Sequence, residues 1–425
     1  MTPTIVVLLI ALASLGTPLF IILGAGSLLA AWSAGLDPAV VVAEMMRLAS
    51  SPNLMAIPLF TLAGVVVSRG GAPQRLLRLC NAGFGWMSGG LPVVALISCA
   101  FFTAFSGASG VTILALGGLL YPMLVQEKYT RKFSLGLLTS SGSLGLLFPP
   151  SLVILLYAIV AGVSIERLFL AGLIPGLLLV AFLALYCMAI SVRIGPVPKP
   201  FSLSAFASAL RDALWDVLLP IGIVVGLFGG FVTVTETATC SAAYALLLEA
   251  VIHRNVPSLT ALCEALRETA VLVGSLFIIL AIALGLTNLL IDAQVPMKLL
   301  ASMEQSVKNT WHFLLLLNGF LLLVGCLMDI FSAIVVVVPL ILPLAQRFGV
   351  DPLHLGIVFL ANLEIGYLTP PVGINLFLGS QRFREPVLEL FRASIPFLLI
   401  MLVWLALITY LPELCLWWKT SPRDQ

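Results

Sequence analysis

The sequence predicts an all-α, multi-pass membrane protein with two re-entrant hairpins and two broken helices, arranged as an inverted repeat. Hydrophobic residues fill 61% of the 425 positions and charged residues only 9%, with a mean hydropathy of +1.16. Soluble domains carry roughly 25% charged residues. Apolar runs of about 20 residues recur from end to end, each long enough to cross a hydrocarbon core. They are continuous rather than alternating, which indicates helices and not barrel strands.

A helix break that occurs twice predicts the repeat. Gly366–Pro371 lies 221 positions after Gly145–Pro150, and both stretches end in a proline pair inside an apolar segment. The same offset relates Pro343 to Pro122. Proline removes an amide donor, clashes with the preceding turn and drives its predecessor out of helical geometry. Equivalent breaks in two halves of a membrane protein favour a binding site between the halves.

The first repeat is predicted to cover residues 1–192. Its N-terminal apolar stretch, 4–33, is interrupted at Gly16–Pro18, so it forms one span or two, and the side of the N-terminus depends on which. Because the stretch lacks a basic start, no cleavable signal peptide is expected. The remaining predicted elements are an interfacial helix at 37–48, a span at 53–69, an interfacial helix at 73–86, a hairpin at about 91–125 tipped at Ser106–Gly110, a broken helix at about 132–160 and a span at 167–192.

A polar, proline-rich linker at 193–212 is predicted to separate this half from the second repeat, residues 213–425. The second half repeats the order of the first. Its predicted elements are spans at 213–231 and 237–252, an interfacial helix at 258–267, a span at 269–291, an interfacial helix at 295–308, a hairpin at about 313–345 tipped at Met328–Phe331, a broken helix at about 353–381 and a last span at 394–411.

The relative orientation of the halves follows from the crossings between the hairpins. The first broken helix and the four spans after it make five crossings, and an odd number inverts the second half. Lys and Arg then divide fourteen against seven between the two faces, which places the richer face in the cytoplasm. The hairpin tips are therefore expected to approach the midplane from opposite sides.

Composition excludes several classes of protein. The net charge is +2, and no basic cluster or aromatic platform indicates a nucleic-acid partner. Seven cysteines are scattered without a CxxC pair, which is typical of small apolar residues in a membrane rather than of disulfides or metal ligands. An intramembrane enzyme is a remote alternative, because neither His-Glu-x-x-His nor a pair of suitably spaced aspartates occurs. No enzymatic activity is expected.

The motifs together resemble one family. Phe105–Gly110, Gly145–Pro150 and Asn362–Gly373 occur in the order and spacing of the large membrane subunit of tripartite ATP-independent periplasmic (TRAP) transporters, the DctM-like family. The resemblance covers nearly the whole chain, with one departure at Val234, where the family often has proline. It implies an elevator-type secondary transporter of the ion-transporter superfamily, located in the bacterial inner membrane.

The same resemblance implies coupling to Na⁺ and two separate partners. These are a small four-helix membrane subunit and a soluble periplasmic binding protein that delivers an organic acid. The leading hypothesis is therefore sodium-coupled import of a carboxylate. A binding-protein-independent carrier of the same superfamily, for dicarboxylates or oxyanions, is the alternative within transport. The solute itself cannot be named from the sequence.

Hairpin tips and helix breaks are expected to bind the ions. A break exposes carbonyl oxygens at one half-helix end and amide donors at the other, which suit Na⁺ and a carboxylate respectively. The proposed sodium ligands are Ser106, Gly107, Ser109, Gly145 and Pro149 in the first repeat, and Asp329, Thr369 and Pro370 in the second. The alternative is that Gly and Ser only allow close helix packing, and that Asp329 caps the helix that follows it.

Substrate contacts are assigned to polar and proline positions beside the breaks. The candidates are Ser141, Pro150, Asn362, Pro371 and Asn375. Core hydrogen bonding is an equal alternative for the two asparagines. Glu364 also lies within a broken helix, where it pairs with an arginine, carries a proton or stays neutral. At the second hairpin tip, an unpaired charge on Asp329 would cost at least about 2.5–3.5 kcal/mol, which a bound cation would offset.

Overall fold

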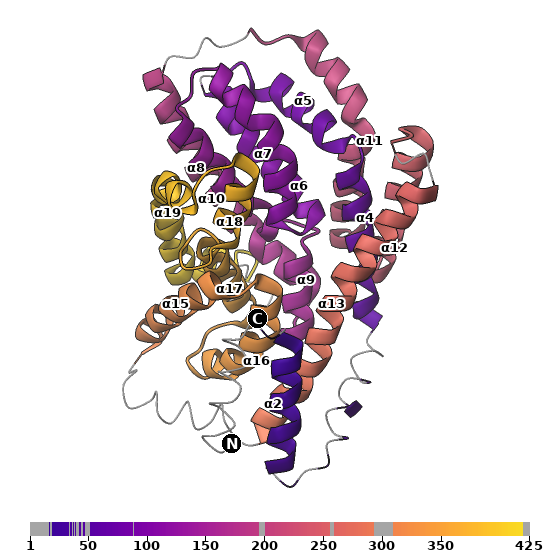
Figure 1. Cartoon of the computed structure of the whole chain (residues 1–425), viewed down its shortest axis with the longest axis vertical. Helices are drawn as coiled ribbons and strands as arrows, with labels where there is room; N and C mark the ends of the chain where they lie inside the picture. The colour runs from indigo at the N-terminus through magenta and orange to yellow at the C-terminus, as the bar shows by residue number, and fades with distance from the viewer. Residues whose placement is uncertain are drawn as a thin grey trace.

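The structure is a computed structural model that describes residues 19–33, 52–87, 89–194, 200–255, 259–292 and 309–419, with a few single positions between 17 and 46. Every regular element in these ranges is a helix, as predicted (Figure 1). Six of the described helices are long and apolar enough to cross a membrane, or up to eight if each of two bent helix pairs forms one span. The protein is therefore an all-α, multi-pass membrane protein.

The helices of the first half follow the predicted order closely. They are α2 (Leu19–Ser33), the 3-10 turn η1 (Pro52–Met55), α4 (Ala56–Arg69), α5 (Ala72–Phe84), α6 (Gly90–Ser106), α7 (Ser109–Gln126), α8 (Arg131–Ser141), the 3-10 turn η2 (Leu144–Leu147), α9 (Leu152–Ala161) and α10 (Ile165–Ile194).

The second half has the corresponding order. Its elements are α11 (Leu203–Phe228), α12 (Val234–Leu247), the π-helical turn η3 (Leu248–Ile252), α13 (Leu259–Asp292), α15 (Thr310–Leu327), α16 (Ile330–Arg347), α17 (Pro352–Gly366), α18 (Ile374–Phe383), α19 (Val387–Tyr410) and the 3-10 turn η4 (Pro412–Leu414).

Matching elements recur at a nearly constant offset. Helices α7 and α16 both have 18 residues, and their first residues, Ser109 and Ile330, are 221 positions apart (330 − 109). Each half also packs against the other. Helix α7 of the first half packs on α18 of the second, and α16 of the second half packs on α9 of the first. Figure 1 shows the hairpin α6–α7 toward one end of the long axis and the hairpin α15–α16 toward the other. The division into repeats at residues 193–212 itself stays a prediction.

The two hairpin tips have different backbone conformations. In the first, Gly107 adopts φ +65° at the end of α6, and Ala108 is extended before α7 begins. Glycine reaches this left-handed conformation without steric cost. In the second, Met328 and Asp329 are both extended, and the Asp329 side chain accepts the backbone N–H of Ser332 in the first turn of α16.

Each broken helix is interrupted at its proline pair. We call residues 142–151 break 1 and residues 367–373 break 2. In break 1, η2 is followed by extended Phe148 and the prolines. In break 2, Gly373 has φ +53° directly before α18. The Pro149–Pro150 and Pro370–Pro371 peptide bonds are cis.

The helices form two groups that contact each other along the long axis (Figure 1). The hairpin bundle contains the two hairpins and both broken helices, with α10 and α19 packed on them. The outer helix group contains α2, α4, α5, α11, α12 and α13, in which α4 contacts both α12 and α13 and α5 packs on α11. The groups are joined by contacts of α5 and α4 with α6, of α4 with α9 and of α13 with α16.

Two predicted boundaries are wrong. The interfacial helix at 258–267 and the span at 269–291 are one continuous helix, α13. No Gly or Pro interrupts the chain where the two were expected to part, and Glu264 and Glu268 stay helical while pairing with Arg69 of α4 at 3.1 and 2.7 Å. Helix α11 begins at Leu203, capped by Ser202, so the predicted span at 213–231 starts ten residues late and the linker is shorter than expected.

Other predicted elements have mixed outcomes. The interfacial helix at 73–86 is α5. The question of one or two spans at 4–33 falls mostly outside the described residues, as do the interfacial helices at 37–48 and 295–308. The departure from the family pattern at Val234 leaves the turn intact, because Thr233 and Glu236 form a complete capping box at the start of α12.

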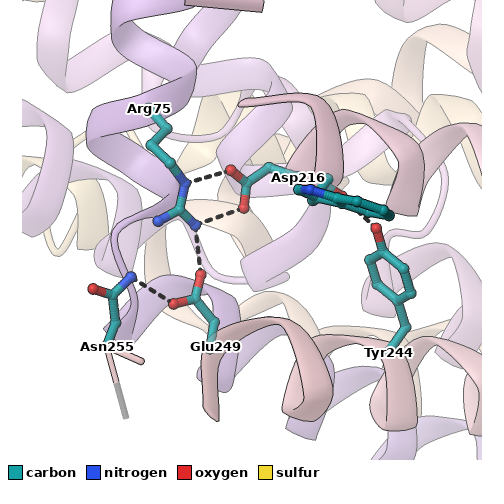
Figure 2. A network of polar contacts seen from close by, with 6 residues as sticks. Arg75, Asp216, Tyr244, Glu249 and Asn255 are labelled. Atoms are coloured by element: carbon teal, nitrogen blue, oxygen red, sulfur yellow. Dashed lines mark hydrogen bonds and ion pairs between the residues drawn. The ribbon is translucent and has the colours of Figure 1, made fainter. Parts of the chain in front are cut away.

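Helix α5 is fastened to the outer helix group by a buried ionic network. The Arg75 guanidinium donates to Asp216 of α11 at 2.6 and 2.8 Å and to Glu249 of η3 at 2.6 Å, and Asn255 also donates to Glu249 (Figure 2). The two carboxylate side chains are 2% and 0% exposed. A Cβ at Gly70 would lie 2.2 Å from the Glu249 carboxyl carbon. The network and the small residue both lie at the 72° bend between α4 and α5.

Candidate ion and substrate site

Both hairpin tips line one cavity of about 280 Å³ between the hairpin bundle and the outer helix group. The first tip contributes Ser106, Gly107 and Ala108, and the second contributes Asp329, Phe331 and Ser332. The wall opposite the tips comes from α4 and α13. Helix α9 adds one further lining residue, Leu152. The lining residues of α4 and α13 are Ile57, Thr61, Leu272, Val273, Ser275, Leu276 and Ile279. The cavity therefore lies where the two helix groups meet.

The first tip is packed directly on break 1. The Thr103 hydroxyl oxygen lies 2.8 Å from the carbonyl oxygen of Gly142 and 2.7 Å from the Thr112 hydroxyl. A Cβ at Gly145 would lie 2.2 Å from the Ala100 carbonyl oxygen, so only glycine allows the break to approach α6 this closely. A Cβ at Gly107 would likewise meet Leu152 at 2.6 Å.

Only some of the residues proposed as sodium ligands in the first repeat lie at the cavity. Ser106 and Gly107 lie at the cavity. Ser109 and Gly145 are buried behind the tip, and Pro149 is half-buried. Close packing by small residues, the alternative reading of this motif, is present in the structure. The role of these groups as sodium ligands stays a prediction.

The second tip is packed on break 2 through backbone and glycine contacts. The backbone N–H of Ile330 donates to the Tyr367 hydroxyl at 2.8 Å, and the N–H of Val372 donates to the Cys326 carbonyl at 3.3 Å. A Cβ at Gly366 would lie 2.4 Å from the carbonyl carbon of Gly325. Both hairpins therefore approach their breaks through a glycine that no larger residue can replace without a shift.

Asp329 has the capping role that was its alternative reading. One carboxylate oxygen accepts the Ser332 backbone N–H at 3.0 Å, and the other accepts the Ser332 hydroxyl at 2.5 Å. The side chain also lines the cavity. A capping carboxylate keeps further lone pairs, so capping and cation binding are compatible.

The other two residues proposed as sodium ligands in the second repeat, Thr369 and Pro370, do not line the cavity. The Thr369 hydroxyl donates to the Ile365 carbonyl of its own helix at 3.0 Å. Pro370 is exposed.

The proposed substrate residues do not line the cavity. Asn362 donates to the Asn318 side chain at 2.7 Å and to the Val358 carbonyl at 2.8 Å, which is the core hydrogen bonding that was its alternative. Asn375 is buried and donates to the Thr139 carbonyl at 3.5 Å. The other three also lie away from the cavity, with Ser141 and Pro150 buried and Pro371 exposed.

Sequence reasoning missed the wall of the cavity and one of the tip contacts. Thr61 and Ser275 lie in apolar helices that were read only as spans, and their polarity within those spans was the available signal. Tyr367 lies inside the motif of break 2, yet its contact with Ile330 depends on how the hairpin folds back. Among the described residues, no group of three or more His, Cys, Asp or Glu side chains could hold a metal. The polar side chains that line the cavity are four hydroxyls and the Asp329 carboxylate.

Two hairpins, two broken helices and a cavity between helix groups are the features of a secondary membrane transporter. The family model described as the DctM component of the tripartite ATP-independent periplasmic transporter matches residues 6–414, and the chain belongs to this family. The predicted resemblance is confirmed.

Relatives and one solved structure agree with the assignment. The chain is 34% identical to the C4-dicarboxylate TRAP transporter large permease protein DctM of Vibrio cholerae over 97% of this chain and 96% of that protein. It is 33% identical to the isethionate TRAP transporter permease protein DctMQ of Oleidesulfovibrio alaskensis, over 94% of this chain and 63% of that protein. The fold is similar to the crystal structure of the YdaH transporter of Alcanivorax borkumensis, with a TM-score of 0.61, 14% identity, and 90% and 89% of the two chains covered.

Proposed function

We propose that this chain is the large membrane subunit of a sodium-coupled importer of small organic acids, located in the bacterial inner membrane. The observation that carries the proposal is the meeting of both hairpin tips at one cavity, opposite α4 and α13. Helices α7 and α16 begin at these tips, and the positive end of a helix dipole favours an anion. The tip carbonyls and the Asp329 carboxylate are oxygen donors suited to Na⁺.

Two relatives support the class of substrate. The names of the Vibrio cholerae and Oleidesulfovibrio alaskensis proteins specify a C4-dicarboxylate and isethionate. Both are small organic anions, one with carboxylates and one with a sulfonate. A cavity of about 280 Å³ accommodates molecules of this size.

Two partner proteins complete the proposed transporter. A small membrane subunit of four helices packs beside this chain, and a periplasmic binding protein delivers the solute. The family is described as tripartite and periplasmic, and the relative named DctMQ is longer than this chain, which covers 63% of it. These two facts support a small membrane subunit and a periplasmic protein as partners.

The sodium proposal is tested by uptake into proteoliposomes that contain this chain, its small subunit and the binding protein. The cognate solute is first selected by thermal shift of the binding protein against succinate, isethionate and related acids. Uptake of the radiolabelled solute is expected with an inward sodium gradient and not with an equal potassium gradient. Equal uptake under both gradients would refute sodium coupling, and uptake without the binding protein would favour the independent carrier.

An elevator movement is proposed to expose the cavity to the two sides in turn. The hairpin bundle would slide against the outer helix group, so contacts across the cavity must break during each cycle. A variant with Thr61→Cys on α4 and Ser332→Cys on α16, in a background without the seven natural cysteines, tests this movement. A short bifunctional thiol reagent is expected to stop uptake, and reduction of a cleavable reagent to restore it. Unimpaired uptake by the cross-linked protein would contradict the movement.

A further inference from the structure

One carboxyl group inside the hairpin bundle is buried without a hydrogen-bond donor. Glu364 lies on α17, one turn before break 2, and is only 1% exposed. Neither of its oxygens has a hydrogen-bond partner among the described residues. The Ser143 side chain, at the start of break 1, lies beside it, and its hydroxyl is also unpartnered. Glu364 thus lies where α17, just before break 2, packs on break 1.

Other buried, uncharged polar groups lie on the two broken helices. Thr139 and Ser140 of α8 and Asn375 of α18 each have a buried oxygen without a partner in the described chain, and Asn375 approaches the Thr139 carbonyl at 3.5 Å. These groups come from the same two broken helices. The two broken helices therefore carry several buried, uncharged polar groups within an otherwise apolar bundle.

Another buried glutamate, Glu249, differs from Glu364 in having donors for its carboxylate. Glu249 is 0% exposed, yet it accepts hydrogen bonds from the Arg75 guanidinium and from Asn255 (Figure 2). Such donors stabilise an ionised carboxylate. Among the described residues, neither a cation nor an N–H group donates to Glu364. In this setting the charged form is strongly disfavoured relative to the neutral acid.

Ser143 is the one side chain found to interact with Glu364 among the described residues. Several titratable side chains on α17 and on the elements packed against it have other partners. They are Tyr157 of α9 with the Pro352 carbonyl, Tyr367 with Ile330, His354 with the Ile408 carbonyl, Cys326 of α15 with the Leu323 carbonyl, Asp329 with Ser332, and on α19 Glu389 with Arg392. Helix α10 carries the free, buried Cys187 and, at its two ends, Arg167 and Arg193.

We propose that Glu364 is a proton-binding site that joins the two broken helices. In the packed bundle it is the neutral acid, whose O–H can donate to the hydroxyl of the neighbouring Ser143. Binding adds one proton from water to a carboxylate oxygen, and release returns that proton to water and leaves a carboxylate. The carboxylate then needs water or a cation, so deprotonation separates break 1 from break 2. Proton binding thereby stabilises the packed bundle.

The direct test is infrared spectroscopy of the full chain in nanodiscs, which does not require transport. The wild-type protein at neutral pH is expected to show a protonated carboxylic acid C=O band that Glu364→Gln removes. Ser143→Ala is expected to keep the band but shift it to higher wavenumber, because the acid loses its acceptor. Glu389→Gln, on the exposed start of α19, is the matched control and should leave the band unchanged. A wild-type spectrum without the band, or a band that survives Glu364→Gln, overturns the proposal.

The consequence for transport rests on the proposed function and is measured separately. Sodium-driven uptake by the wild type is expected to fall from neutral to alkaline pH as Glu364 loses its proton. Glu364→Gln, which mimics the neutral acid, should retain uptake at neutral pH and lose the alkaline fall. The same fall in Glu364→Gln and wild type would overturn the link between this proton and transport. Failure of sodium coupling itself would leave the infrared result intact, so the two failures are distinguishable.

Discussion

The backbone N–H of Ile330 donates a hydrogen bond to the hydroxyl of Tyr367 over 2.8 Å, which fastens the second hairpin tip to the second helix break. Ile330 is the first residue of α16, so its N–H is one of the donors that a helix start leaves without an intrahelical partner. Tyr367 follows the last residue of α17. One side chain thus connects two elements that both border the proposed ion site.

Tyr367→Phe tests this connection. The substitution removes the acceptor and leaves a buried N–H unpaired, which costs about 1–3 kcal/mol. We expect a lower unfolding temperature in detergent and a weaker apparent affinity for sodium in uptake assays. Tyr410→Phe, whose ring stacks on Trp311 at the end of α19, serves as the control and should change neither. An unchanged unfolding temperature in Tyr367→Phe would show that this contact contributes nothing to the fold.

The glycine contact between the second hairpin and its break gives a second prediction. In Gly366→Ala the new Cβ would lie 2.4 Å from the Gly325 carbonyl carbon, and a shift of this kind in a packed core typically costs about 1–3 kcal/mol. We expect reduced yield of folded protein and loss of uptake. Gly319→Ala, on α15 with no atom within 4 Å of the added carbon, is the matched control. Equal behaviour of the two variants would contradict the close approach.

The buried network at Arg75 predicts a large loss of stability from one surface-helix residue. Arg75→Ala leaves Asp216 and Glu249 buried without their cation, and such a loss costs about 3–5 kcal/mol. Arg69→Ala removes an exposed pair with Glu264 and Glu268, which is worth about 0–1 kcal/mol. Thermal unfolding of both variants in detergent should therefore show a much larger decrease for Arg75→Ala. A similar decrease in both would contradict the role of the network.

The order of elements could be predicted because each depends on local sequence. Proline pairs interrupt helices wherever they lie, and Gly107 marks a turn through its own conformational freedom. The continuity of α13 could not be predicted, because charged residues at 264 and 268 resemble an interfacial helix until Arg69 is placed beside them. The same holds for Thr61 and Ser275, which become cavity residues only when α4 and α13 lie against the hairpin tips. Asn362 was drawn into the proposed substrate site by its proximity in sequence, whereas its contacts run to α15 and its own helix.

Two substitutions of Asp329 separate its role as a helix cap from its proposed role in cation binding. Asparagine caps helices about as well as aspartate, so Asp329→Asn should keep its bond to the Ser332 backbone and leave the unfolding temperature nearly unchanged. It removes the negative charge from the cavity, and we expect a higher sodium concentration for half-maximal uptake. Asp329→Ala should show this sodium effect together with the loss of about 0.5–2 kcal/mol of capping energy. Sodium dependence like that of the wild type in Asp329→Asn would exclude the carboxylate as a sodium ligand and leave Asp329 as a helix cap alone.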